Sequence, residues 1–282
     1  MGIFDFIRDK SGLGVCIFKP SEVHFIDRPQ PPDSFFRVRE YAGWELQQKM
    51  KVLPGAHWLK AEYTAPAFEN LSFAYKNQIF CVLIVYVHKK TGKAISIGVK
   101  RDNLVRECKK NNLVPCVYRI LVDDFEKPSL DKLEEVGKGW NLLHAETGVE
   151  INPAELANDI PIKMSPWELH DFAVQVVRNY ITDKLKYKIL SYQTVLGIEP
   201  QIFFEDNNGM KNWVVVRHVV YPNKEANMPA NIFDIMPSLK ECNGYFASVG
   251  FCSSDMSNSC LYRGEMAMIN FQGMKKVAHG IA

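Results

Sequence analysis

The sequence lacks a long apolar run, a strong excess of charge of one sign and a secretion signal. Its longest apolar run, Ile79–Val87, has the length of a β-strand, whereas a membrane-spanning helix needs roughly 20 apolar residues. The formal net charge of +2 over 282 residues does not predict a polyanionic partner. The first ten residues include Asp5, Arg8 and Asp9, where a secretion signal would be apolar. We therefore expect a cytoplasmic protein without a membrane anchor.

Common catalytic and metal-binding motifs are also missing. No two of the seven cysteines have the C-x-x-C spacing, and most of them lie within apolar segments. This pattern favours buried free thiols in a reducing compartment over disulfides or a zinc site. The seven histidines show no H-E-x-x-H spacing, and the chain has no G-x-S-x-G elbow, P-loop or G-x-G-x-x-G fingerprint.

The first half of the chain predicts a proline-rich arm and an α/β unit. Four prolines between Lys19 and Ser34 interrupt regular structure, so this segment is expected to be extended. The run Gln78–His88 is too apolar for a half-solvated strand and predicts a central strand covered on both faces. The other expected elements are a helix over Ser34–Val52, one or two helical turns within Ala67–Tyr75, a strand over Ala94–Val99, a helix over Arg101–Asn112 and a strand over Leu113–Val122.

The most clearly marked helix of the chain begins after Ser165. Ser165 is suited to be the N-cap, Pro166 occupies the first helical position and Glu168 completes an S-x-x-E capping box. An apolar stripe with helical spacing follows, and the helix is expected to end near Thr182. The stripe consists of Leu169, Phe172, Ala173, Val176, Val177 and Tyr180.

Two apolar strands, Gln201–Phe204 and Trp213–Val220, are expected next, joined by a polar turn built on Asn207-Asn208-Gly209. A short helix over Asn231–Lys240 and a strand over Tyr245–Phe251 follow. The first half of the chain has the same order of strand, turn, strand, helix and strand. Either an internal duplication or two independent α/β units would produce this similarity.

Together these elements predict an α/β protein with a mixed β-sheet flanked by helices. The acidic segment Asp123–Gly139 ends in two glycines around Lys138 and has the composition of a linker. It divides the chain into residues 1–139, an α/β unit with the proline-rich arm, and residues 140–282, a second α/β unit. The two parts would form either separate domains or one domain.

The expected order α-β-β-β-α-β over about residues 163–251 resembles the core of the PD-(D/E)xK nuclease-like fold. The resemblance implies this core in the C-terminal half, preceded by a second β-β-α-β unit. In that family carboxylates hold Mg²⁺, and a lysine orients the attacking water.

Carried over by position, the resemblance is partial in its residues. Pro200 matches the family's proline, and Glu168 lies in the helix that supplies one acid. Gln201 stands in place of the aspartate, and Val215 in place of the acid on the third strand. Arg217 stands in place of the lysine; arginine is permanently charged and relays protons poorly. The resemblance thus implies the fold, while these residues argue against its usual reaction.

The favoured hypothesis is a catalytically degenerate nuclease-like protein that uses no cofactor and binds a protein or nucleic-acid partner. The near-neutral charge leans toward a protein partner. By analogy alone, one such partner is a bacterial toxin that an immunity-type protein neutralises.

Two other hypotheses remain open. Glu199 and Glu205 share a strand face with Gln201, so they and Glu168 could form a rearranged Mg²⁺ or Mn²⁺ site of an active nuclease. The third hypothesis is a scaffold protein that associates through an exposed apolar patch.

Basic residues cluster around the first predicted hairpin and helix. They include Lys89, Lys90, Lys93 and Arg101. These residues form either a phosphate-contacting face or a solvated helix face that nearby acids compensate.

Overall fold

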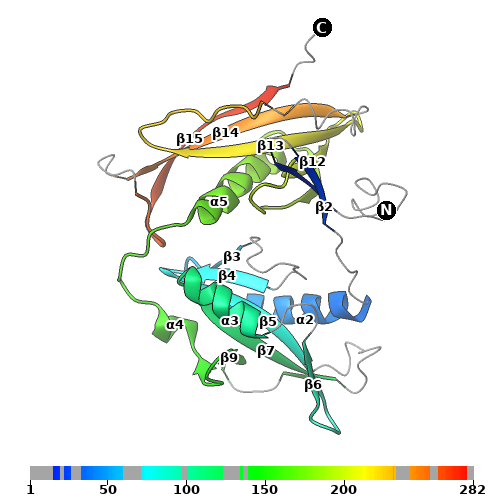
Figure 1. Cartoon of the computed structure of the whole chain (residues 1–282), viewed down its shortest axis with the longest axis vertical. Helices are drawn as coiled ribbons and strands as arrows, with labels where there is room; N and C mark the ends of the chain where they lie inside the picture. The colour runs from blue at the N-terminus through cyan, green and yellow to red at the C-terminus, as the bar shows by residue number, and fades with distance from the viewer. Residues whose placement is uncertain are drawn as a thin grey trace. The chain divides into compact units, whose positions relative to one another are not determined.

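The computed structural model describes most of the chain, whose elements fall into two compact units. Unit 1 comprises residues 1–28 and 163–282, and unit 2 comprises residues 29–162. Both units contain mixed sheets with flanking helices, which confirms the expected α/β class (Figure 1). None of the described helices is long and apolar enough to cross a bilayer. The described residues are 15–19, 22–26, 33–59, 71–96, 101–122, 134–135, 139–230, 232, 242–254 and 260–277.

Unit 2 is built on a sheet to which the described residues contribute eight strands. Its elements are α2 (Asp33–Met50), β3 (His57–Leu59), β4 (Leu71–Tyr75), β5 (Gln78–His88), β6 (Ala94–Ser96), α3 (Arg101–Lys110), β7 (Val114–Val122), β8 (Glu134–Glu135), β9 (Leu142–His144), β10 (Glu150–Ile151) and α4 (Pro153–Leu156). The strand order is β10-β9-β7-β5-β4-β3, with β6 paired to β5 and β8 to β7. All of these pairs are antiparallel except β5 and β7, which run parallel.

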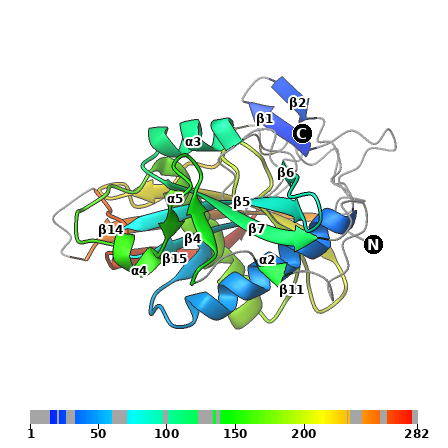
Figure 2. The same cartoon turned by 90° about the horizontal axis from the view of Figure 1, so that it is seen from below.

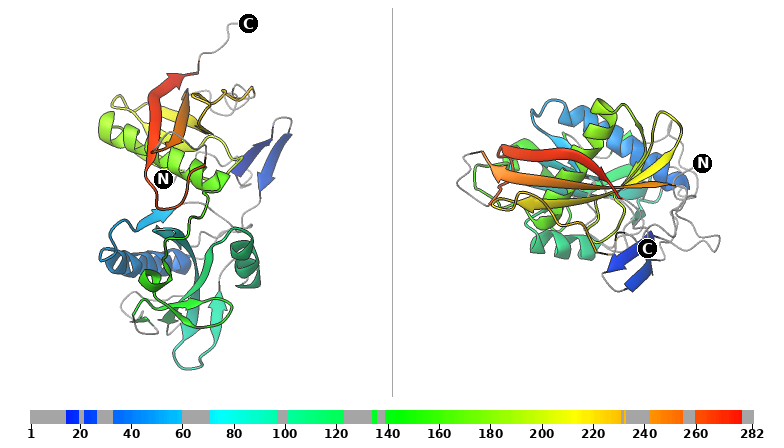
Figure 3. Two further views of the ribbon diagram at one scale, coloured as in Figure 1. Left: turned by 90° about the vertical axis from the view of Figure 1, so that its left-hand side faces the viewer. Right: turned by 90° about the horizontal axis from the view of Figure 1, so that it is seen from above.

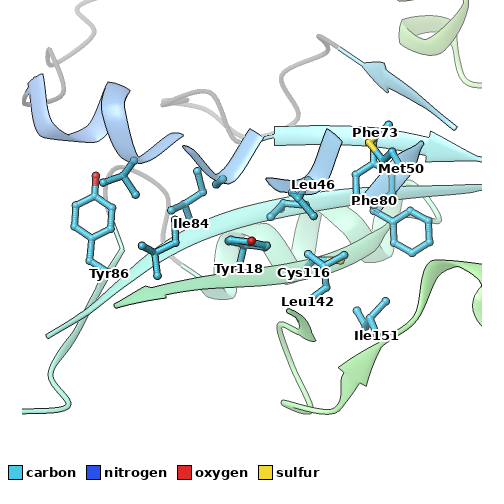
Figure 4. Close-up of a cluster of buried hydrophobic side chains, with 14 of the residues drawn as sticks. Leu46, Met50, Phe73, Phe80, Ile84, Tyr86, Cys116, Tyr118, Leu142 and Ile151 are labelled. Carbon is cyan, nitrogen blue, oxygen red and sulfur yellow. The ribbon is translucent and has the colours of Figure 1, made fainter. Parts of the chain in front are cut away.

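Helices cover β5 and β7 from both sides. Helix α2 lies on one side of these strands and α3 on the other (Figure 2). The apolar residues of α2 are buried at helical spacing and pack on side chains of β5 and β7 that point to one face (Figure 4). Strand β5 is buried along most of its length, as expected for a central strand.

In unit 1, helix α5 (Pro166–Asn179) continues into a π-helical turn, Tyr180–Lys184. The predicted capping box is confirmed. The Glu168 N–H donates to Ser165 Oγ at 3.5 Å, and the Ser165 N–H donates to Glu168 Oε2 at 2.8 Å. Pro166 occupies the first helical position, where a backbone N–H would have no carbonyl partner within the helix, so the missing N–H of proline costs no hydrogen bond.

The larger sheet of unit 1 has, among the described residues, five strands in the order β11-β12-β13-β14-β15. They are β11 (Lys188–Tyr192), β12 (Ile202–Glu205), β13 (Lys211–Val220), β14 (Asn243–Ser253) and β15 (Ala267–Lys276). Only β13 and β14 are parallel among these neighbours. Helix α5 packs on the face that carries Val214 and Val216, while Trp213 and Val215 belong to a second apolar cluster on the opposite face.

The two units repeat one topology. A helix leads in each, α2 or α5, and three antiparallel neighbours follow, β3-β4-β5 or β11-β12-β13. A parallel strand comes next, β7 or β14, and then an antiparallel one, β9 or β15. The parallel pairs β5/β7 and β13/β14 each bring nine residues into register.

Corresponding core residues also recur at nearly constant separation along the chain. On the strands, Val82 and Ile84 of β5 correspond to Val214 and Val216 of β13, all facing the leading helix. This agreement in topology, face and spacing favours the internal duplication. On the leading helices the buried residues Val38, Ala42, Leu46 and Met50 correspond to Leu169, Ala173, Val177 and Ile181.

Several expectations need correction. The units part between residues 162 and 163 rather than after 139, because β9 and β10 belong to the sheet of β7. Residues Leu71–Tyr75 form a strand instead of helical turns, because they pair with β5. Part of the expected arm forms β2 (Glu22–Ile26), paired with β1 (Val15–Lys19). In the structure the repeat equates β5 with β13. The order of elements expected from the sequence instead equates Gln78–His88 with Gln201–Phe204. Apart from Ile232, the helix expected over Asn231–Lys240 lies outside the described residues.

Candidate functional site

Several polar side chains of unit 1, most of them buried, lie around the carboxyl half of β13, some on the face that carries α5 and others on the opposite face of the sheet. In open α/β sheets, ligands bind near the carboxyl ends of parallel strands, and β13 and β14 both end on this side. We call this group the β13 cluster. Its members are Glu168, His170, Glu199, Gln201, Arg217, His218 and Arg263.

Gln201 is fully buried, and its side-chain amide is engaged by the backbone on both sides. Its Nε2 donates to the carbonyl of Ile198 at 2.8 Å, and its Oε1 accepts from the N–H of Val216 at 2.8 Å. The amide therefore ties the start of β12 to β13. The amide carries no negative charge, and its oxygen already accepts the hydrogen bond from Val216.

Glu168 is held by an arginine that the sequence did not indicate. Arg263 Nε donates to Glu168 Oε1 at 2.6 Å, and its Nη2 donates to Oε2 at 3.0 Å. Both side chains are only 4% exposed. This fork-to-fork pair neutralises the carboxylate, which also accepts the capping hydrogen bond from Ser165. The structure thus assigns Glu168 a complete structural role.

Glu199 is the second buried carboxylate of the cluster. It forms an ion pair with Arg217, although within the described part of the chain neither of its oxygens has a hydrogen bond of good geometry. Burial raises the pKa of Glu199, and the charge of Arg217 opposes this effect. Arg217 is about one-third exposed, so it joins the buried acid to the surface.

Two histidines complete the cluster. The rings of His170 on α5 and His218 on β13 lie 5.9 Å apart between centroids. His170 Nε2 is buried and lacks a hydrogen-bond partner among the described residues. Burial lowers the pKa of His170 to about 3, and the nearby His218 and Arg217 add to the effect. Burial, followed by the charge of Arg217, lowers the pKa of His218 as well.

His170 should make the stability of unit 1 depend on pH. Its pKa is depressed in the folded state and returns to about 6.5 on unfolding, so the unfolded state takes up the proton first as the pH falls. The stabilisation is therefore present above pH 6.5 and is lost below it. We expect a loss of about 2 kcal/mol between pH 7 and pH 5. Urea unfolding at a series of pH values measures this loss.

The variant His170→Phe isolates this contribution, because Glu199 and His218 titrate in both proteins. The variant should lose less stability on acidification than the wild type. The exposed His57 of unit 2 offers a matched control, His57→Phe, which should follow the wild type. Equal pH profiles for wild type and His170→Phe would contradict the prediction.

The remaining proposed ligand, Glu205, and the family's third acid position, Val215, do not join these residues. Glu205 stands at the far end of β12, six residues beyond Glu199, or roughly 20 Å of extended chain. Val215 is fully buried in the apolar cluster with Trp213. Among the described residues, no three acidic, histidine or cysteine side chains come together as a metal-binding group. The residues present therefore do not fit the Mg²⁺ site that the nuclease resemblance implies.

The basic residues of unit 2 are largely engaged locally. Arg101 donates to the carbonyls of Ala145 and Glu146. On the same helix, Lys109 pairs with Glu146 at 2.6 Å. Lys89, Lys90 and Lys93 lie in and around the turn between β5 and β6. This arrangement favours a solvated helix face compensated by acids over a phosphate-contacting face.

Unit 2 provides an internal comparison for the β13 cluster. In the repeated register of the parallel strands, Val85 and Tyr86 occupy the positions of Arg217 and His218. The same topology therefore forms without a guanidinium and an imidazole at these positions. These two polar residues are consequently not a requirement of the fold.

The sequence did not indicate His170, His218 or Arg263 as members of one group. The two histidines have no metal-type spacing, and Arg263 lies 95 residues from the acid that it binds. Only the strand alternation that places His218 on the helix-facing side of β13 gave a usable signal.

Residues 167–277 are similar to a protein family described as a domain of unknown function (DUF8840). The match runs from the first turn of α5 to the end of β15, which is the extent of one copy of the repeat. No curated protein and no solved structure matches the chain.

Proposed function

We propose that this protein is a catalytically degenerate, nuclease-like binding protein. One observation carries the proposal, and it concerns Gln201, which stands in place of the family's metal-binding aspartate. Its side chain is neutral, and both the nitrogen and the oxygen of its amide form hydrogen bonds with the backbone. Glu168, which stands for the helical acid, is neutralised by Arg263. A divalent cation prefers several negatively charged oxygen ligands, and the β13 cluster offers no such set.

The element order of unit 1 supports the resemblance on which this proposal rests. Helix α5 is followed by β11, β12 and β13 as antiparallel neighbours, and β14 lies parallel to β13. Two parallel neighbouring strands need a crossover connection. In the expected order α-β-β-β-α-β, the second helix stands in this connection.

A protein is the partner that the charge pattern favours. The formal net charge is +2, and the cations of α3 are compensated by acids or bonded to carbonyls. We place the protein in the reducing cytoplasm, since its described cysteines are free thiols and most are buried. An immunity-type role, in which the protein neutralises a toxin, remains an analogy within this proposal.

Calorimetric titration of Mn²⁺ into metal-free protein, with DNA and RNA cleavage assays on the same sample, tests the proposal. We expect neither saturable binding nor cleavage. The competing nuclease with a rearranged site predicts both, and it predicts their loss in Glu199→Gln. The control Glu205→Gln separates a site at the β13 cluster from one near the β12 turn. Saturable Mn²⁺ binding with cleavage would overturn the proposal.

A further inference from the structure

Strand β15 forms one edge of the sheet of unit 1. It pairs with β14 on one side, and no other described strand pairs with it on the opposite side (Figure 3). The free side of such a strand presents unpaired N–H and C=O groups that can accept a further strand. With ten residues, β15 is long for an edge strand.

Features that normally protect an edge strand against pairing with another chain are confined to the second half of β15. There the register with β14 shifts between Ala247 and Val249, and Gly273 adopts a positive φ of 95°. This irregularity and the following Lys275 and Lys276 hinder the addition of another strand.

The first half carries none of these features. The segment Met266–Phe271 contains neither a charged residue nor proline. Met268 and Ile269 are each 45% exposed although they point to opposite faces of the sheet, and Met266 is 82% exposed. A regular, uncharged edge with apolar side chains uncovered on both faces is a site for strand addition.

The repeat shows what covers the corresponding edge in unit 2. Strand β9 corresponds to β15, and it is covered by β10, which runs antiparallel to it. In unit 1 the described residues provide no strand in this place. The occupant that the topology favours is therefore an antiparallel β-strand.

We propose that Met266–Phe271 pairs with the same segment of a second copy of this chain, so that one sheet continues through both copies. A two-fold axis between residues 268 and 269 makes the pairing antiparallel. It places Met268 opposite Ile269, and Met266 opposite Phe271. These two pairs are apolar, whereas Ala267 stands opposite Asn270. Apolar cross-strand pairs add to the stability of the ladder.

Two further features favour a second copy over an unrelated peptide. An edge reserved for another protein would still need protection against pairing with its own copies, and this segment has none. The shift in register between β14 and β15 ends the regular part of β15 just beyond Phe271. The two-fold axis between the copies is therefore confined to the unprotected segment. The lysines of the two copies then lie at opposite ends of the ladder, where their like charges do not meet.

Analytical ultracentrifugation of the full chain from about 1 to about 200 µM tests the proposal, and its outcome does not depend on the function proposed above. We expect a reversible dimer. Met268→Lys should weaken it at least tenfold, since an edge lysine blocks strand addition. Met210 is also 45% exposed and lies in the turn between β12 and β13, so Met210→Lys is a matched control that should dimerise like the wild type. Circular dichroism confirms that each variant is folded.

Hydrogen exchange of the wild type gives a second readout that needs no variant. Amide protection of residues 266–271 should increase with protein concentration, while that of β11, at the other edge of the sheet, should not change. A wild type that stays monomeric throughout the range would overturn the proposal. A dimer with protection elsewhere, or one that Met210→Lys weakens equally, would also overturn it.

Discussion

Replacing Gly244 with alanine is expected to destabilise unit 1 by about 3 kcal/mol, because the added methyl group has no room. Gly244 lies directly across from Trp213 in the parallel pair of β13 and β14. A Cβ at this position would stand 2.2 Å from the indole ring, well inside van der Waals contact. Trp213 is fully buried and cannot move aside without opening the core. Urea unfolding followed by circular dichroism measures the loss.

A double-mutant cycle tests the cause of this loss. Trp213→Leu alone removes buried contacts, but it should remove most of the additional cost of Gly244→Ala, so that the two changes are strongly non-additive. Gly250→Ala on the same strand is the control, because its Cβ would meet its nearest atoms at 3.4 Å. Additive costs in the cycle would show that Gly244 matters for backbone reasons instead.

The need for glycine at position 244 could not be predicted from the sequence. A glycine within a strand signals close approach by another group, but the group itself depends on the register of two parallel strands. That register joins segments separated by a crossover, and no local pattern specifies it. The start of α5 is different. Ser165, Pro166 and Glu168 determine it within four consecutive residues, and this prediction is confirmed.

Short strands were the elements that the sequence predicted least well. The sequence of Ala67–Tyr75 predicts one or two helical turns, although Leu71–Tyr75 pairs with β5 over its whole length. A five-residue segment carries too little periodicity to distinguish a helix from a strand, so its tertiary partner decides. The sequence also indicated the internal repeat but equated the wrong strands of the two halves, for a related reason. Strand β6 forms the second arm of a hairpin with β5, but it lies outside the repeated order of strands.

The candidate site was predictable only in part. Strand alternation placed Glu199 and Gln201 on one face, and the structure brings Glu199 to Arg217 as an ion pair. The partners that neutralise or engage these groups come from distant segments. Arg263 and the N–H of Val216 determine what Glu168 and Gln201 do, and neither contact leaves a signal in local spacing.

Replacing Arg263 with methionine is expected to cost about 3–5 kcal/mol in the free energy of unfolding at pH 7. The substitution leaves the Glu168 carboxylate buried without its guanidinium partner. Removing one member of a buried pair exposes the full cost of burying the other charge, whereas removing both members is often tolerated. Urea unfolding of the single variant gives the cost.

The double variant Glu168→Gln, Arg263→Met distinguishes a structural pair from a catalytic acid. Glutamine can keep the capping box with Ser165, so the double variant should be more stable than Arg263→Met alone. A surface ion pair supplies the control, in which Lys110 Nζ lies 3.2 Å from Glu107 Oε1. Lys110→Met should lower the free energy of unfolding by less than about 1 kcal/mol. If Arg263→Met cost no more than this control, the pair would not hold α5 to the loop before β15. Glu168 would then be free to serve as a ligand, and the rearranged metal site would regain its strongest candidate.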